Sequence, residues 1–353
     1  MTKIGHGIRW SLFAAMLMVM PVGCDEGTGL PASRIVVYVS VDEQVARTVL
    51  DEFEARSGIE VHLIGDSEAS KTTGLVQRLR AEHDAPIADV FWSSEAMQTI
   101  GLAGEGVLAE YDGVAWPRSH RDEGGRWFAF SPRPRVIVYD PHRLEEGDRP
   151  DTWEDAVDGR FADRLVMADP RFGTTGGHLA AMESAWTTAG EPDRFQAFLE
   201  GLHASRARVL PGGNAAVVDA VAGGEADIGF TDADDVRAAQ ARGIEVDMLF
   251  PRHDVDRPGG GTFLMPNTVA IVEGAPHPEE AARLLAFLLS DDTARMLATS
   301  VSGNIPLQPT VADEFPELVV MDPLDVDLQD AARRSPAVIR RTVERLRDAG
   351  AQP

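Results

Sequence analysis

The chain has almost none of the residues that several common kinds of site require. Its 353 residues include one cysteine, Cys24, and three tyrosines. A lone cysteine excludes an internal disulfide and a site built from paired thiolates. There is no nucleophile elbow, and the nine histidines show no HExxH or similar metal spacing. The apolar run of residues 10–20 is too short to span a membrane as a helix.

Acidic side chains are in large excess. There are 57 Asp and Glu against 33 Lys and Arg, which gives a formal net charge of −24. Charge of this sign argues against nucleic acid or an anionic membrane surface as a partner, and it favours attraction of cations. With 44% apolar and 25% charged residues the composition is globular, and the length suits two domains of ordinary size.

The N-terminal segment has the pattern of an export signal. Residues 1–23 join a short basic start, an apolar run and small residues. They end in Pro21-Val22-Gly23-Cys24, which resembles the lipobox of bacterial lipoproteins, although that pattern usually has leucine where Pro21 stands. We expect cleavage before Cys24, lipidation of Cys24, a tether over residues 24–33 and a lipid-anchored protein in the periplasm. Ordinary cleavage that leaves a free thiol is the alternative.

Strands and helices alternate after the tether, which predicts an α/β fold with βαβ units. The run at residues 34–39 has no polar alternation, which is typical of a strand buried on both faces, and further strands are predicted at residues 59–64, 88–92, 164–168 and 207–210. Ser40 and Glu43 have the spacing of a capping box before the first helix. A last amphipathic helix is predicted over residues 336–348, capped by Ser335.

Two pairs of apolar runs predict crossovers between two lobes. The first pair, residues 126–130 and 135–139, is separated by Ser131-Pro132-Arg133-Pro134, and two prolines suit a crossover better than a sheet interior. The second pair is residues 262–264 and 268–272. We therefore expect a clamshell that binds in its cleft, with residues 34–130 plus 262–300 as lobe 1 and residues 131–261 plus 301–353 as lobe 2.

An acidic stretch follows one of the predicted strands. Ile228-Gly229-Phe230 ends the strand, and Thr231, Asp232, Asp234 and Asp235 precede a helical pattern. Ligands bind at such strand ends in open α/β sheets. Capping of the helix explains any one of these side chains. It explains three acids in four positions less well, because like charges so close raise each other's pKa unless something positive lies between them.

The order of these segments resembles the bacterial periplasmic solute-binding proteins of ABC importers, most closely the ferric-iron-binding, transferrin-like branch. The resemblance covers nearly the whole mature chain, and its segments are residues 38–53, 88–92, 133–139, 213–232 and 278–290. It implies a type II periplasmic-binding-protein clamshell, with two α/β lobes joined by two crossover strands. It also implies a monomer that hands its ligand to a permease in the inner membrane.

The resemblance also implies where a metal would be bound. Iron binders of this branch commonly use paired tyrosines after the strand at residues 228–232, a histidine or acid near the first strand and a glutamate after the third. Here the tyrosine pair corresponds to Asp234-Asp235, the first-strand ligand to Asp42, and the glutamate to Ser94 or Glu95. Phenolate ligation of the usual kind is therefore absent.

The anion half of the family's site is retained. In the family, the regions that correspond to Thr174-Thr175-Gly176-Gly177 and to Asn214 can hold a phosphate or carbonate. Free N–H groups and the helix dipole favour an anion at each of these helix N-termini. The alternative is that the glycines only permit a tight turn and that Asn214 is only an N-cap.

Three hypotheses follow for the function. The first is capture of a hard metal cation, foremost ferric iron with or without an anion, because carboxylate oxygens suit Fe³⁺, Ca²⁺, Mn²⁺ and Mg²⁺ alike. Its ligands would be Asp42, Glu95, Asp232, Asp234 and Asp235, with Ser40, Glu68, Ser94 and Thr231 beside them. A salt bridge to Lys71, three residues further on, explains Glu68 equally well without a ligand. The second hypothesis replaces the metal with a phosphonate, a phosphate ester or an amine. The third is an extracytoplasmic enzyme that uses His178; we expect no catalysis and no catalytic cofactor.

Overall fold

The computed structural model describes residue 2, residues 33–66 and residues 72–350, without the side chains of residues 348–350. Residues 33–353 form a unit separate from residues 1–32. The predicted signal segment, Cys24 and nearly all of the predicted tether lie outside the described residues, as does Glu68. Within the described part, no helix has both the length and the apolarity needed to cross a bilayer.

Strands and helices alternate through the described chain. The first half contains β1 (Arg34–Val39), α1 (Glu43–Ser57), β2 (Glu60–Gly65), α2 (Thr73–Ala81), β3 (Val90–Ser93), α3 (Ala96–Gly104), β4 (Phe128–Tyr139), β5 (Leu165–Ala168) and α4 (Thr175–Thr188). The second half contains α5 (Arg194–Ala204), β6 (Arg208–Leu210), α6 (Gly213–Ala222), β7 (Ile228–Asp232), α7 (Ala233–Ala241), β8 (Asp247–Leu249), β9 (Leu264–Ile271), α8 (Pro278–Leu288), α9 (Asp291–Thr299), α10 (Pro309–Ala312) and α11 (Leu328–Gly350).

Helices cover both faces of the sheet, as the apolar runs predict. Ile35, Val37 and Val39 of β1 pack in one core with α1 and α8, whereas Tyr38 packs in another with α2 and α3. Successive side chains of a strand point to opposite faces, so a strand buried on both faces needs an unbroken apolar run. The strands of the second half are divided in the same way between α4 with α5 and α6 with α7.

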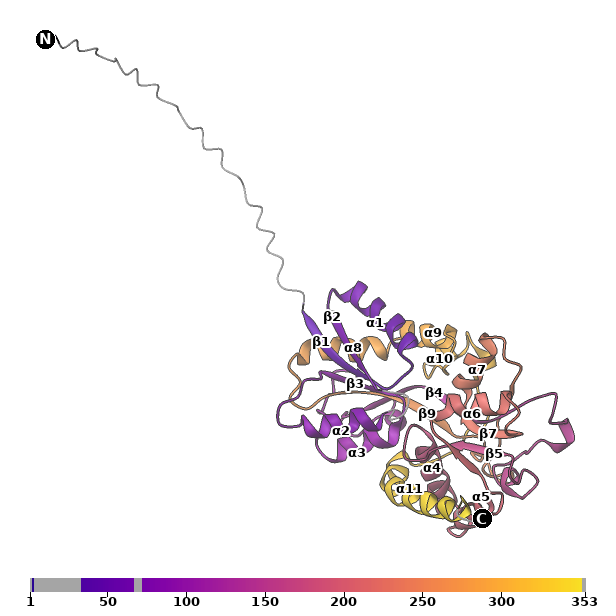
Figure 1. The fold of residues 1–353 in the computed structure, drawn as a ribbon. Coiled ribbons are helices and arrows are strands. Elements are labelled where there is room, and N and C mark those ends of the chain that lie inside the picture. The colour runs from indigo at the N-terminus through magenta and orange to yellow at the C-terminus, as the bar shows by residue number, and fades with distance from the viewer. Residues whose placement is uncertain (1, 3–32, 67–71, 351–353) are drawn as a thin grey trace. The chain divides into compact units, whose positions relative to one another are not determined.

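Two antiparallel strands connect the two halves. The strand order is β2-β1-β3-β9-β4-β7-β5-β6, with β8 also paired to β4. In Figure 1, β4 and β9 run between the strands β1 to β3 and the strands β5 and β7. This topology confirms the α/β clamshell with two crossover strands; the residue limits of the two lobes stay a prediction.

The crossover around Ser131 differs from the expected break between two runs. β4 is one strand of 12 residues, and its pairing with β9 shifts in register between Phe130 and Arg133. Ser131 has a positive φ of 41° at the shift. Pro132 and Pro134 fit there because an irregular ladder does not require every backbone N–H.

Two predicted helix starts are wrong. Asp42, not Ser40, caps α1, and its carboxylate accepts hydrogen bonds from the N–H groups of residues 44 and 45. The last helix begins at Leu328, where the Asp327 carboxylate accepts from the next turn, and Pro336 lies inside it. Proline removes one helical hydrogen bond, and packing of α11 against α3, α4 and α5 stabilises the longer helix.

Candidate functional site

A cleft of about 160 Å³ opens where the strand ends of the two halves meet. Eight of the predicted site residues line it: Ser40, Asp42, Ser94, Thr174, Asn214, Asp232, Asp234 and Asp235. Ser40 and Ser94 follow β1 and β3, and Asp232 ends β7. The fold therefore brings together residues that are up to 195 positions apart in the chain, from Ser40 to Asp235, as their places at strand ends predict.

The other described candidates do not line the cleft. Thr231 is buried, and its hydroxyl donates to the Asn214 carbonyl at 3.3 Å. Thr175, Gly176 and Gly177 form the buried start of α4. A Cβ added at Gly177 would lie 2.2 Å from Oε1 of Glu95, so this glycine permits close packing between α4 and Glu95.

Asp232 lies at the centre of a buried hydrogen-bond network. Its Oδ1 accepts from Nη1 of Arg135 at 2.7 Å, and its Oδ2 accepts from Nε of Arg133 at 3.1 Å. The Thr174 hydroxyl and the Asn214 amide also donate to Oδ2, at 2.8 and 3.0 Å. The positive charge that the acidic stretch requires thus comes from two arginines.

Arg133 connects the two sides of the cleft. Its Nη2 donates to the backbone carbonyl of Ser94 at 3.0 Å, after β3. Its Nε also lies 3.1 Å from Asp234, and its side chain is only 5% exposed. Sequence reasoning missed both arginines of the network as site residues. The sequence does contain an indication of them: Arg133 and Arg135 lie in a crossover strand whose other residues are predicted to be buried. Arginines in such a strand are expected to pair with acidic side chains.

These arrangements shift the pKa values of the buried carboxyls in opposite directions. Burial opposes ionisation of Asp232, but the charges of Arg135 and Arg133 outweigh it and lower its pKa. Burial raises the pKa of Glu95 to about 7, against the hydrogen bonds from the N–H groups of Gln98 and Met97. Glu95 caps α3 and does not line the cleft. Because its pKa is raised and that of Asp232 is lowered, Glu95 is the more weakly charged of the two at neutral pH.

Uncharged polar groups also contribute to the wall of the cleft. The Thr72 hydroxyl donates to Oγ of Ser40 at 3.0 Å, and the N–H of Ser94 donates to the same oxygen. Asn267 of β9 donates to the Ser131 carbonyl, while its buried Oδ1 receives no hydrogen bond within the described residues. Asn267, Asn304 and Arg242 are further lining residues that the sequence did not single out.

The acidic residues are close enough to share one metal ion. One carboxylate oxygen from each of Asp232, Asp234 and Asp235 lies within 4.8 Å of the others. Oxygen ligands of this kind suit hard cations. None of the three tyrosines lines the cleft; Tyr38, for example, is buried and donates to Glu82 at 2.7 Å. A metal here would be bound by carboxylates that also face guanidinium groups.

Comparisons with known proteins agree with this architecture. The family model of bacterial extracellular solute-binding proteins matches residues 85–328. The major ferric iron-binding protein of Neisseria meningitidis is 26% identical over 321 residues, which cover 87% of this chain and 88% of that protein. Iron-bound HitA from Pseudomonas aeruginosa superposes with a TM-score of 0.74 at 22% identity, over 88% of this chain and 99% of that one. AfuA from Actinobacillus pleuropneumoniae, with exogenous fructose-6-phosphate bound, has a TM-score of 0.74 at 19% identity, over 90% and 99%.

Proposed function

Because the chain belongs to the bacterial extracellular solute-binding protein family, we propose that it captures a small cargo in its cleft and delivers it to the permease of an ABC importer. The family is one of binding proteins for transport and not of enzymes. We further propose that the mature protein works in the periplasm as a monomer, held there by a lipid on Cys24. Mass spectrometry of the membrane-extracted protein tests the anchor.

The proposed cargo is ferric iron together with a small anion. The observation that carries this proposal is the mixed charge of the cleft: three carboxylates lie within 4.8 Å of one another, and one of them, Asp232, accepts from Arg133, Thr174 and Asn214. The carboxylates suit the metal, and the guanidinium, hydroxyl and amide donors suit the anion. The volume of about 160 Å³ favours such a small complex. The relatives named as iron-binding support the same choice.

Equilibrium dialysis of metal-free protein against ferric citrate tests the cargo. The double substitution Asp234→Ala and Asp235→Ala is expected to abolish iron binding and leave the fold intact, because both side chains lie at the surface of the cleft. Asp219→Ala, on the exposed face of α6, is the matched control and should bind like the wild type. Unchanged iron affinity in the double variant would place the metal elsewhere.

A phosphorylated organic solute is a second candidate. The guanidinium of Arg133 lines the cleft beside Thr174 and Asn214, at the starts of α4 and α6, and offers donors for a phosphate; AfuA was solved with fructose-6-phosphate bound. A thermal-shift screen separates the candidates, because a ligand at 100 times its Kd adds about 2.7 kcal/mol. Stabilisation by fructose 6-phosphate in the presence of a chelator, with none by ferric citrate, would replace iron as the cargo.

A further inference from the structure

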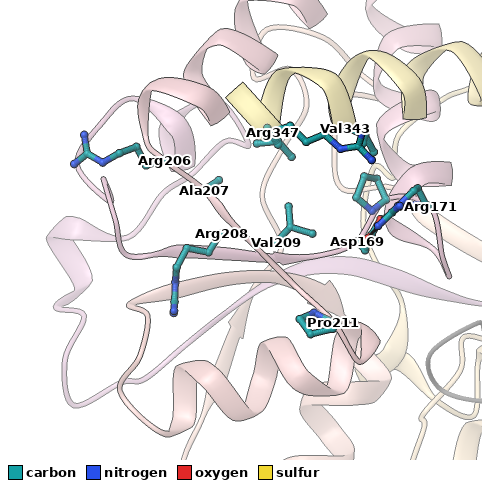
Figure 2. Close-up of a pocket in the computed structure, with 11 residues that line it drawn as sticks. Asp169, Arg171, Arg206, Ala207, Arg208, Val209, Pro211, Val343 and Arg347 are labelled. Atoms are coloured by element: carbon teal, nitrogen blue, oxygen red, sulfur yellow. Dashed lines mark hydrogen bonds and ion pairs between the residues drawn. The ribbon is translucent and has the colours of Figure 1, made fainter. Parts of the chain in front are cut away.

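A second cavity lies between the edge strand β6 and the last helix α11. Its volume is about 420 Å³, and it shares no lining residue with the cleft. This volume lies within the range of roughly 300 to 1,000 Å³ that is usual for small-molecule pockets. Figure 2 shows its residues around β6, with α11 beside them.

The walls of this cavity are apolar. Ala207, Val209 and Pro211 alternate along the β6 segment, so they belong to one face of it, and Val209 points toward α11 in Figure 2. Val343 and Leu346 are one turn apart on α11 and close the cavity from the other side. Val209 remains 36% exposed, so the apolar surface is not fully covered by the described chain.

Positive charge surrounds these walls. Arg171 and Arg347 lie beside α11 in Figure 2, whereas Arg206 and Arg208 extend away from that helix. Arg171 is paired with Asp169, its Nε lying 2.9 Å from the carboxylate. Arg347 is exposed. Burial opposes ionisation of Asp169, but the hydrogen bonds and charge of Arg171, and then the charge of Arg347, outweigh it and lower the pKa of that carboxyl. Arg206 and Arg208 are paired with Asp163 and Glu225, so Arg171 and Arg347 are the guanidiniums that supply positive charge on the α11 side of the cavity.

We propose that this cavity binds a small amphiphilic carboxylate. Its hydrocarbon chain would lie between Val209 and the α11 residues Val343 and Leu346, and its carboxylate would pair with the guanidinium of Arg347. The apolar walls account for the chain, and the planar fork of a guanidinium matches a carboxylate. The cavity shares no lining residue with the cleft, and the proposal does not depend on the cargo.

Calorimetric titration of the full chain with butanoate, hexanoate and octanoate tests the proposal. Affinity is expected to rise about fourfold for each added methylene, as burial of hydrocarbon requires. Arg347→Gln should weaken octanoate binding roughly fivefold, the effect of losing one partly exposed ion pair. Arg340→Gln removes an exposed arginine from the same helix outside the cavity and should change nothing.

A second variant separates filling of the cavity from its charge. Val343→Trp places a large side chain in the cavity and should abolish octanoate binding, with thermal unfolding as the check that the protein is folded. Affinity that is independent of chain length, or that is equal in the wild type and Arg347→Gln, would overturn the proposal. Octanoate binding that appears only after residues 351–353 are removed would also overturn the proposal, because those residues would then be the occupant of the cavity.

Discussion

The substitution Asp232→Asn tests the charge compensation under the cleft. It keeps the shape of the side chain and removes its charge. Both carboxylate oxygens accept hydrogen bonds, from Arg135 on one side and from Arg133, Thr174 and Asn214 on the other. In the asparagine, one of these two oxygens is replaced by an NH₂ group, which is a hydrogen-bond donor. In either orientation of the amide, this NH₂ group faces at least one other donor and no hydrogen bond forms there.

The expected cost is large because the partners stay buried. Asp232 is 1% exposed, and the side chains of Arg133 and Arg135 are 5% and 0% exposed. Breaking a buried ion pair from one side typically destabilises a protein by about 3–5 kcal/mol. Total folding stability is usually only about 5–15 kcal/mol. We therefore expect Asp232→Asn to lose a large part of the stability while its surface counterpart does not.

Urea unfolding of metal-free protein at pH 7 measures this difference. Asp219→Asn is the control, since Asp219 is 65% exposed and 4.0 Å from Arg242, and its loss should cost less than about 1 kcal/mol. The lowered pKa of Asp232 adds a second check. Its contribution to stability is present above the unfolded pKa of about 3.9 and is lost as the pH falls through the folded pKa, so the two proteins should converge in acid. A loss below about 1 kcal/mol at pH 7 would show that the arginines do not need Asp232 and would refute the compensation argument.

Two further substitutions act away from the ion pairs. Burial lowers the pKa of His253 to about 3, whereas in the unfolded chain it is about 6.5. Between these two pH values the unfolded chain binds one proton more than the folded protein. The free energy of unfolding should therefore fall by about 1.4 kcal/mol for each pH unit by which the pH decreases. His253→Asn keeps a donor for the Gly261 carbonyl and should flatten that slope by one proton in urea titrations at pH 4.5 to 6.5; an unchanged slope would contradict it. Gly177→Ala places a methyl group against Glu95 and should lower the unfolding free energy by about 1–3 kcal/mol, whereas Gly101→Ala, with open space around it, should raise it slightly. Equal values for the two alanine variants would show that the packing at Gly177 is not tight.

Much of the fold was predictable because the central strands are buried on both faces. The unbroken run predicted at residues 34–39 appears in the structure as β1 (Arg34–Val39). The start of α1 was not predictable in the same way, because Ser40, Asp42 and Glu43 all suit a cap and only the path of the chain selects Asp42. The extra turns of α11 before Pro336 depend on packing against helices that are distant in sequence.

The cleft was predictable from strand ends, but its charge balance was not. The acidic residues follow β7 in one stretch, so the sequence shows them directly. Arg133 and Arg135 reach Asp232 only because β4 and β7 pair antiparallel with Arg135 opposite Asp232. A single strand cannot reveal that register. The predicted ligand roles of Asp42, Glu95 and the aspartates stay predictions, to be decided by the binding experiments above.

The pairing of β4 with β9 has a mechanical consequence for any closing motion. Two strands joined by a ladder resist sliding, because a slide would break every rung together, whereas a twist spreads a small distortion over the whole ribbon. The β4–β9 pairing is interrupted by the register shift between Phe130 and Arg133, so we expect twisting to be easiest there, at Ser131. Substitutions there should change how readily the two halves rotate, and hence how long a cargo is retained, without touching the cargo itself.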